Sequence, residues 1–94
     1  MEILPDLITR NRGQMIKRSM TINGHRTSIS LEHPFWQELQ HIAKSRHMAL
    51  AALVAEIDLH RSRRLALGEA SGGLSSEIRI YILNAALGKT HDPG

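Results

Sequence analysis

Cysteine is absent from the sequence, and aromatic residues are scarce, with one Phe, one Trp and one Tyr in 94 residues. Without cysteine, a disulfide scaffold and a cysteine-based zinc site are excluded, and a cytoplasmic location is expected. No apolar run approaches the ~18 residues of a membrane span, and the N-terminus has no basic-then-apolar signal pattern. The core must therefore be mostly aliphatic and helical, and a core this small often needs a second subunit.

Motifs of catalysis and metal binding are also missing. No Gly-x-Ser-x-Gly elbow, phosphate-binding loop or dinucleotide fingerprint occurs. The histidines, at positions 25, 33, 41, 47, 60 and 91, include no pair at the i, i+3 or i, i+4 spacing that places two imidazoles on one helix face. We therefore expect no catalytic residues, no metal and no cofactor, so the chain is not expected to be an enzyme. An active site at a dimer interface is the remaining alternative.

Acidic residues are absent from one basic stretch, although the net charge of the whole chain is only +3. Basic side chains lie between Thr9 and Ser30 with no Asp or Glu among them: Arg10, Arg12, Lys17, Arg18 and Arg26. Such a local positive field attracts phosphates and indicates a nucleic-acid partner. A solvated basic tail is the alternative interpretation.

The dipeptide Asn23-Gly24 separates two alternating runs and predicts a β-hairpin, because a type I′ turn needs positive φ at both central residues. Pairing across this turn sets Ile22 opposite His25, Met20 opposite Thr27, and Arg18 opposite Ile29. One face of the ribbon then carries Met20, Ile22, Thr27, Ile29 and Leu31. The opposite face is polar and carries Lys17, Ser19, Thr21, Arg26, Ser28 and Ser30.

Three helices are predicted after the hairpin, beginning near Pro34, Leu50 and Ser75. Apolar residues recur at helical spacing in each: Phe35, Trp36, Leu39, Ile42 and Ala43; Leu50, Leu53, Val54 and Ile57; Ile78, Tyr81, Ile82 and Ala85. In the third helix Ile80, Leu83 and Leu87 widen the stripe, which predicts burial against another element or subunit. The expected organisation is a flexible arm over residues 1–16, one domain over 17–87 and a frayed tail over 88–94.

The order strand, helix, short turn, helix resembles the ribbon-helix-helix family of DNA-binding proteins. The resemblance lies in residues 27–32, 35–43 and 48–57, and residues 74–79 resemble the C-terminal helix added in a branch of short bacterial proteins. It covers roughly residues 17–87. The fold class it implies is mainly α with a short β-ribbon: a ribbon-helix-helix homodimer with an N-terminal hairpin or arm and a third, C-terminal helix.

The resemblance implies that strands of two subunits pair across a two-fold axis and enter the major groove of DNA. Base contacts are expected from the outward side chains Arg26, Ser28 and Ser30, for which an ordinary solvent-facing strand is the alternative. Phosphate contacts are expected from Lys17 and Arg18 and from the amides that begin the second helix, Met48, Ala49, Leu50 and Ala51. The implied dimer core comprises Ile29, Leu31, Trp36, Leu39, Leu53 and Ile57.

Two features depart from the family pattern. Ala49 stands where the family often has Ser or Thr, so a side-chain cap is missing. A hairpin beside the reading strand would give a dimer four strands, too wide for a major groove, so either the first strand moves aside or the sheet lies differently on its partner.

The expected function is that of a sequence-specific transcription regulator, a repressor, that binds double-stranded DNA as a homodimer and has no membrane partner. The alternative is a protein-interaction or antitoxin-like dimeric module with little DNA reading. Its contact surface would be Ile80, Leu83 and Leu87 of the third helix.

Overall fold

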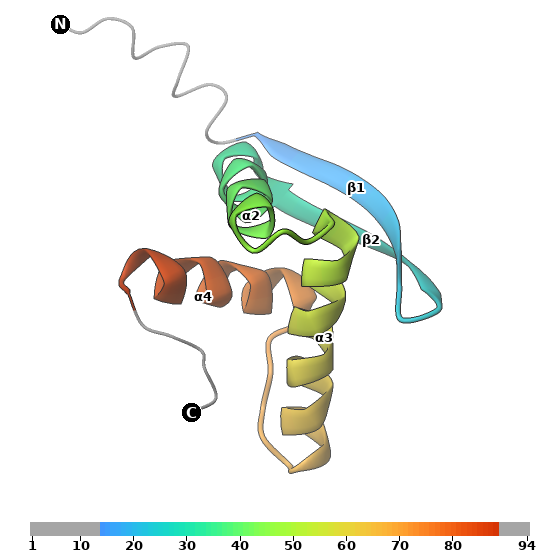
Figure 1. Cartoon of the computed structure of the whole chain (residues 1–94). Helices are drawn as coiled ribbons and strands as arrows, with labels where there is room; N and C mark the ends of the chain where they lie inside the picture. The colour runs from blue at the N-terminus through green and yellow to red at the C-terminus, as the bar shows by residue number, and fades with distance from the viewer. Residues whose placement is uncertain (1–13, 89–94) are drawn as a thin grey trace, which may run out of the picture.

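The computed structural model describes residues 14–88, so the predicted arm as far as residue 13 and the predicted tail from residue 89 lie outside this range. The elements in chain order are β1 (Met15–Ile22), β2 (His25–Glu32), α2 (His33–Ser45), α3 (Leu50–Ala66) and α4 (Leu74–Ala86). The two strands form a curved ribbon that lies over the helices (Figure 1). A mainly α fold with a short β-ribbon and a third C-terminal helix is confirmed, and β1 begins two residues before the predicted start of the domain.

The hairpin has the predicted register. Ile22 pairs with His25 and Met20 with Thr27 in an antiparallel ladder. The turn residues have positive φ, 49° at Asn23 and 85° at Gly24, as a two-residue hairpin turn requires. Because side chains alternate across a strand, this register sends one set of side chains toward the helices and the other set outward.

The inward side of the hairpin forms the core together with the three helices. Trp36 of α2 is the largest buried side chain, and its indole N–H donates a hydrogen bond to the carbonyl oxygen of Ile16 in β1 at 2.8 Å. The predicted inward stripes supply most of the other buried positions: Ile22, Ile29, Leu31, Leu39, Ile42, Ala43, Leu53, Val54, Ile57, Ile78 and Ile82. The polar N–H of the tryptophan thus has a partner even though the ring is buried.

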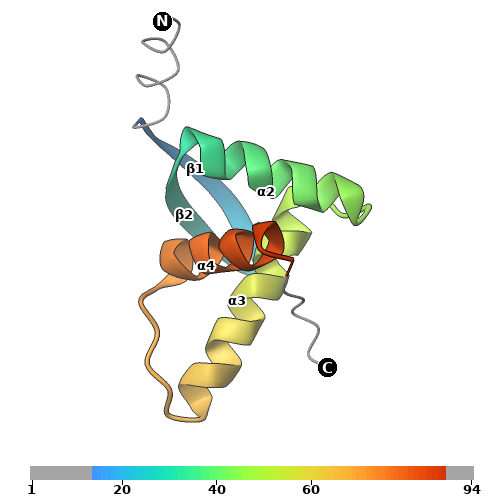
Figure 2. The same cartoon turned by 90° about the vertical axis from the view of Figure 1, so that its left-hand side faces the viewer.

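Polar contacts fix the three helices relative to one another. Arg46, just after α2, donates hydrogen bonds of 2.9 and 3.1 Å to the two carboxylate oxygens of Glu56 in α3, and one of 3.0 Å to the hydroxyl of Tyr81 in α4. The hydrogen bonding of Arg46 to Glu56 is the main reason that the pKa of Arg46 is raised. Figure 2 shows α4 crossing α3, whose C-terminal half extends beyond the rest of the domain.

The six residues predicted as a dimer core are buried within one chain. Their exposed fractions range from 0% to 4%: Ile29, Leu31, Trp36, Leu39, Leu53 and Ile57. They belong to one core cluster to which β1, β2, α2, α3 and α4 of the same chain all contribute. Their place in a dimer core stays a prediction.

Candidate nucleic-acid interface

The outer face of the hairpin is polar and basic. The outer face is defined here as the side of the hairpin formed by six residues: Lys17, Ser19, Thr21, Arg26, Ser28 and Ser30. They lie opposite one another as the pairs Lys17–Ser30, Ser19–Ser28 and Thr21–Arg26. No Asp or Glu occurs between residues 14 and 31. The outer face therefore combines positive charge with hydroxyl groups, a composition suited to phosphates and base edges.

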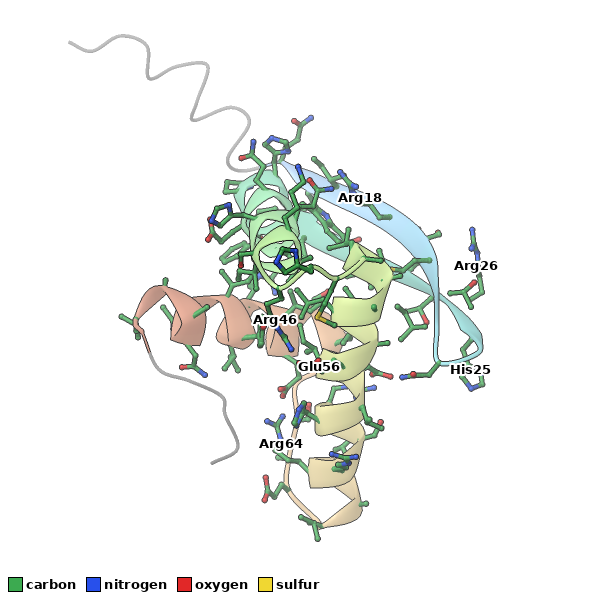
Figure 3. The ribbon with its side chains drawn as sticks, in the orientation of Figure 1. Arg18, His25, Arg26, Arg46, Glu56 and Arg64 are labelled. Atoms are coloured by element: carbon green, nitrogen blue, oxygen red, sulfur yellow. The ribbon has the colours of Figure 1, made fainter. Side chains whose placement is uncertain are left out.

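Arg26 and the paired serines are the groups best placed for a base contact. The guanidinium of Arg26 has no carboxylate partner among residues 14–88, and its closest hydrogen bond is a weak one of 3.5 Å to the hydroxyl of Thr21. The hydroxyls of Ser19 and Ser28 lie 3.1 Å apart. Figure 3 shows Arg26 projecting from the turn end of the hairpin, away from the helices. Arginine is the side-chain type that most often binds guanine through two hydrogen bonds.

Ser30, the third predicted base contact, is half-buried and lies beside α4. Its carbonyl oxygen accepts a hydrogen bond of 3.0 Å from the hydroxyl of Ser75. In a two-residue hairpin the residues that flank the turn, here Ile22 and His25, form a hydrogen-bonded pair. Hydrogen-bonded and non-hydrogen-bonded pairs then alternate along the ladder, so the backbone N–H and C=O groups of Arg26, Ser28 and Ser30 point away from β1. The start of α4 therefore reaches the free edge of β2 at Ser30.

Lys17 and Arg18, both predicted to contact phosphates, lie on different sides of the hairpin. Lys17 belongs to the outer face. Arg18 pairs with Ile29 on the inward side, and its guanidinium lies 5.1 Å from the ring centroid of Trp36. Arg18 remains exposed at the edge of the ribbon (Figure 3), so it would reach a phosphate from the α2 side and not from the outer face.

The start of α3 provides fewer free amides than predicted. The N–H of Met48 donates a hydrogen bond of 2.8 Å to the carbonyl oxygen of Ala43, so this amide is already occupied within the chain. Ala49 is the N-cap and makes no side-chain cap hydrogen bond, as expected from its methyl group. The amides of Ala49, Leu50 and Ala51 lie at the positive end of the helix dipole, and a phosphate contact there stays a prediction.

An ion pair that the sequence did not predict neutralises the acid at the end of β2. Nε of Arg79 in α4 donates a hydrogen bond of 3.0 Å to the carboxylate of Glu32. The pKa of Glu32 is lowered, first by a hydrogen bond with its own backbone and then by Arg79. The two residues lie far apart in the chain, and no periodic pattern connects them. The positive field of the outer face is therefore not opposed by a free carboxylate at this end.

No three His, Asp or Glu side chains within residues 14–88 gather in a way that could hold a metal ion. No helix in that range is long and apolar enough to cross a membrane.

Comparison with known proteins identifies the family. The ribbon-helix-helix domain family matches residues 15–86. Among solved structures, the chain is similar to an uncharacterized protein from Bordetella pertussis Tohama I, with a TM-score of 0.67 and 23% identity over 93% of this chain and 70% of that chain. No curated protein matches the chain. Since the matched range includes β1, β2, α2, α3 and α4, the chain belongs to the ribbon-helix-helix domain family, a family of DNA-binding and regulatory modules.

Proposed function

We propose that this protein is a sequence-specific transcription regulator, acting as a repressor, that binds double-stranded DNA as a homodimer in the cytoplasm. The observation that carries the proposal is the outer face of the hairpin, where Lys17, Arg26 and a pair of serine hydroxyls stand together without an acidic residue. β-ribbon readers of DNA use such a face in the major groove.

Each group on the outer face has a chemical role in this proposal. Arg26 donates two hydrogen bonds to O6 and N7 of a guanine, and the hydroxyls of Ser19 and Ser28 donate to or accept from neighbouring base edges. Lys17 neutralises a phosphate, which supplies affinity without sequence preference. The amides of Leu50 and Ala51 at the start of α3 are candidates for a second phosphate contact.

The intramolecular hairpin bears on how the ribbon fits the groove. A major groove admits a two-stranded ribbon, and β1 with β2 already forms one within a single chain. A four-stranded sheet arises if two such hairpins pair edge to edge. In that case either β1 moves aside from the groove or the four-stranded sheet lies differently on the DNA.

Selection from random duplex DNA by mobility shift, followed by titration at 50 and 200 mM salt, tests the proposal. For about four to six phosphate contacts, the affinity should fall by roughly 10²–10³ between these concentrations. The triple variant Ser19→Ala, Arg26→Ala, Ser28→Ala should lose preference for the selected sequence. Arg63→Ala, which removes an exposed arginine from the far part of α3, is the control and should keep it. A triple variant with unchanged sequence preference would refute the assignment.

A second candidate function is a protein-interaction or antitoxin-like dimeric module. It is favoured by one observation, the exposure of Ile80, Leu83 and Leu87 on α4. Stable capture of a partner protein through these residues, together with no retention on duplex DNA at 50 mM salt, would favour this function over the first.

A further inference from the structure

The end of β2 and the first half of α4 meet through two contacts of matching spacing. The hydroxyl of Ser75 donates a hydrogen bond of 3.0 Å to the carbonyl oxygen of Ser30. One helical turn later, Nε of Arg79 donates a hydrogen bond of 3.0 Å to the carboxylate of Glu32. Four residues advance a helix by about 6 Å, and two residues advance a strand by about 6.6 Å. The start of α4 is therefore in register with the end of β2, and each contact supports the other.

Glu32 occupies a position from which its carboxylate could reach the outer face of the hairpin. It follows Ser30 by two residues and pairs with Met15, so alternation places it on the outer side of the ribbon. Lys17 pairs with Ser30, which makes Glu32 and Lys17 diagonal neighbours. Diagonal neighbours lie about 7–8 Å apart, within reach of two long side chains of opposite charge. Without another partner, the carboxylate of Glu32 would be able to pair with Lys17.

The structure gives this carboxylate to Arg79 instead. Nη2 of Arg79 also lies 3.0 Å from the carboxylate oxygen of Glu32, so two nitrogens of the guanidinium contact one oxygen. The guanidinium lies 5.7 Å from the ring centroid of Phe35 in α2, a second favourable contact for the cation. The side chains of Arg79 and Glu32 are 33% and 29% exposed, so the pair can open without unfolding of the core. Arg79 thus holds the carboxylate on the α4 side of the strand.

We propose that Arg79 is a positioning residue for DNA binding, because it holds the carboxylate of Glu32 against α4 and keeps Lys17 available for a phosphate. This inference rests on the proposed function, since it explains what keeps one of the phosphate contacts of the outer face uncompensated. Loss of the guanidinium lets Glu32 pair with Lys17, and the outer face then loses affinity that does not depend on DNA sequence. Helix α4 thereby affects DNA binding through charge, without a contact of its own with DNA.

Mobility shifts with a mixed-sequence DNA duplex at 50 and 200 mM salt test the inference. Arg79→Gln should weaken binding about tenfold at 50 mM salt and reduce the slope of log affinity against log salt concentration by about 1. Glu32→Gln added to this variant should restore both values, because no carboxylate remains to occupy Lys17. In the wild-type background Glu32→Gln should change the affinity less than about twofold. Equal effects of Glu32→Gln in both backgrounds would overturn the inference, since independent charges act additively.

A second pair of variants distinguishes positioning from a direct contact of Arg79 with phosphate. Lys17→Ala should reduce the slope against salt concentration by about 1 in the wild type. The same change should have no further effect in Arg79→Gln, where Glu32 already occupies the lysine. If Arg79 bound a phosphate itself, the two losses would add. Equal losses from Lys17→Ala in both backgrounds would therefore contradict the proposed role.

Two control variants separate the charge of Arg79 from its effect on packing. Arg63→Gln removes an equal charge from an exposed site on the far part of α3, and it should lower the affinity less than about twofold because salt screens distant charges. Ser75→Ala weakens the junction of α4 with β2 without a change of charge, so any effect on DNA binding should not be reversed by Glu32→Gln. An effect of Arg79→Gln no larger than that of Arg63→Gln would overturn the inference. Thermal unfolding of each variant checks that it is folded.

A measurement without DNA separates this inference from the proposed function. The Nε–H of Arg79 donates to Glu32, so its NMR signal should exchange with water more slowly in the wild type than in Glu32→Ala. Equal exchange rates would show that the contact does not persist in solution and would overturn the inference alone. A chain with slowed exchange that retains no duplex DNA would refute the proposed function and not the contact. A chain that binds DNA with additive effects of the variants would refute only the positioning role of Arg79.

Discussion

The hydroxyl oxygens of Ser19 and Ser28 lie 3.1 Å apart at directly opposite positions of β1 and β2. The pair occupies the middle of the outer face, between Lys17 and the Thr21–Arg26 pair. Each hydroxyl has one donor and two lone pairs, so the bond between them still leaves a donor and several acceptor sites free. The centre of the proposed reading face can therefore adapt to more than one base edge.

Replacing both central serines should alter sequence preference without altering stability. The double variant Ser19→Ala, Ser28→Ala removes exposed hydroxyls, so the free energy of unfolding should stay within about 0.5 kcal/mol of the wild type. Each lost hydrogen bond to a base should weaken binding of the selected sequence by about 1 kcal/mol. Competition mobility shifts measure the change. Lys17→Ala is the comparison. Loss of a phosphate contact should weaken binding to all DNA sequences alike, and it should reduce the slope of log affinity against log salt concentration by about 1.

Gly24 is expected to be difficult to replace, because its φ is +85°. A Cβ at this position would meet no atom within 4 Å, so the cost of Gly24→Ala comes from the backbone conformation alone, at about 1–2 kcal/mol. In a domain of this size the melting temperature should fall by roughly 4–16 °C. Gly24→Asn should cost less, since Asn tolerates the left-handed region. Equal melting temperatures for Gly24→Ala and the wild type would show that the turn does not have this conformation.

The hairpin could be predicted from the sequence because its determinants are local. Asn23 and Gly24 specify the turn, the turn specifies the register, and the alternation on either side specifies which side chains face inward. The apolar stripes of the helices are local in the same sense, and the buried positions of α2 and α3 follow them. The sequence alone therefore predicts which residues form the outer face, and the observed register agrees.

The partners of these surfaces could not be predicted in the same way. Periodicity shows that Leu31 and Leu53 face inward but not what covers them, and the structure covers them with elements of the same chain. The contacts of α4 with the end of β2, from Ser75 to Ser30 and from Arg79 to Glu32, join segments more than 40 residues apart. Such contacts depend on tertiary packing, for which a single sequence contains no periodic signal.

A side-chain cap added at the start of α3 should stabilise the protein. Ala49 has the extended backbone of an N-cap, with φ −70° and ψ 150°, but no side-chain hydrogen bond. In Ala49→Ser the hydroxyl can accept a hydrogen bond from the first turn, which is worth about 1 kcal/mol and should raise the melting temperature by roughly 4–8 °C. Ala52→Ser, the same change inside the helix, should be neutral or slightly destabilising. If the two variants melted alike, a cap would not form at Ala49.

The ion pair between Glu77 and Arg64 should make stability depend on acidic pH. Glu77 is 8% exposed, and hydrogen bonding from Arg64, assisted by Ser71, lowers its pKa despite the opposing effect of burial. Because the folded state favours the ionised carboxylate, its contribution is fully present above the pKa of the unfolded chain, about 4.3. That contribution is lost as the pH falls through the lower pKa of the folded state.

Glu77→Gln should therefore lower the free energy of unfolding at pH 7 and flatten its dependence on pH below about 5. We expect a loss of about 1–2 kcal/mol at pH 7, at the low end for a charged hydrogen bond, because the side chain of Arg64 is 39% exposed and partly screened. Glu69→Gln is the matched control: its carboxylate lies 3.8 Å from Arg64 and is 56% exposed, so its removal should change little. Urea unfolding at several pH values measures both variants. Some acid sensitivity should persist in Glu77→Gln, since the pKa of Glu32 is also lowered, but a pH dependence identical to that of the wild type would exclude a stabilising role for the Glu77 carboxylate.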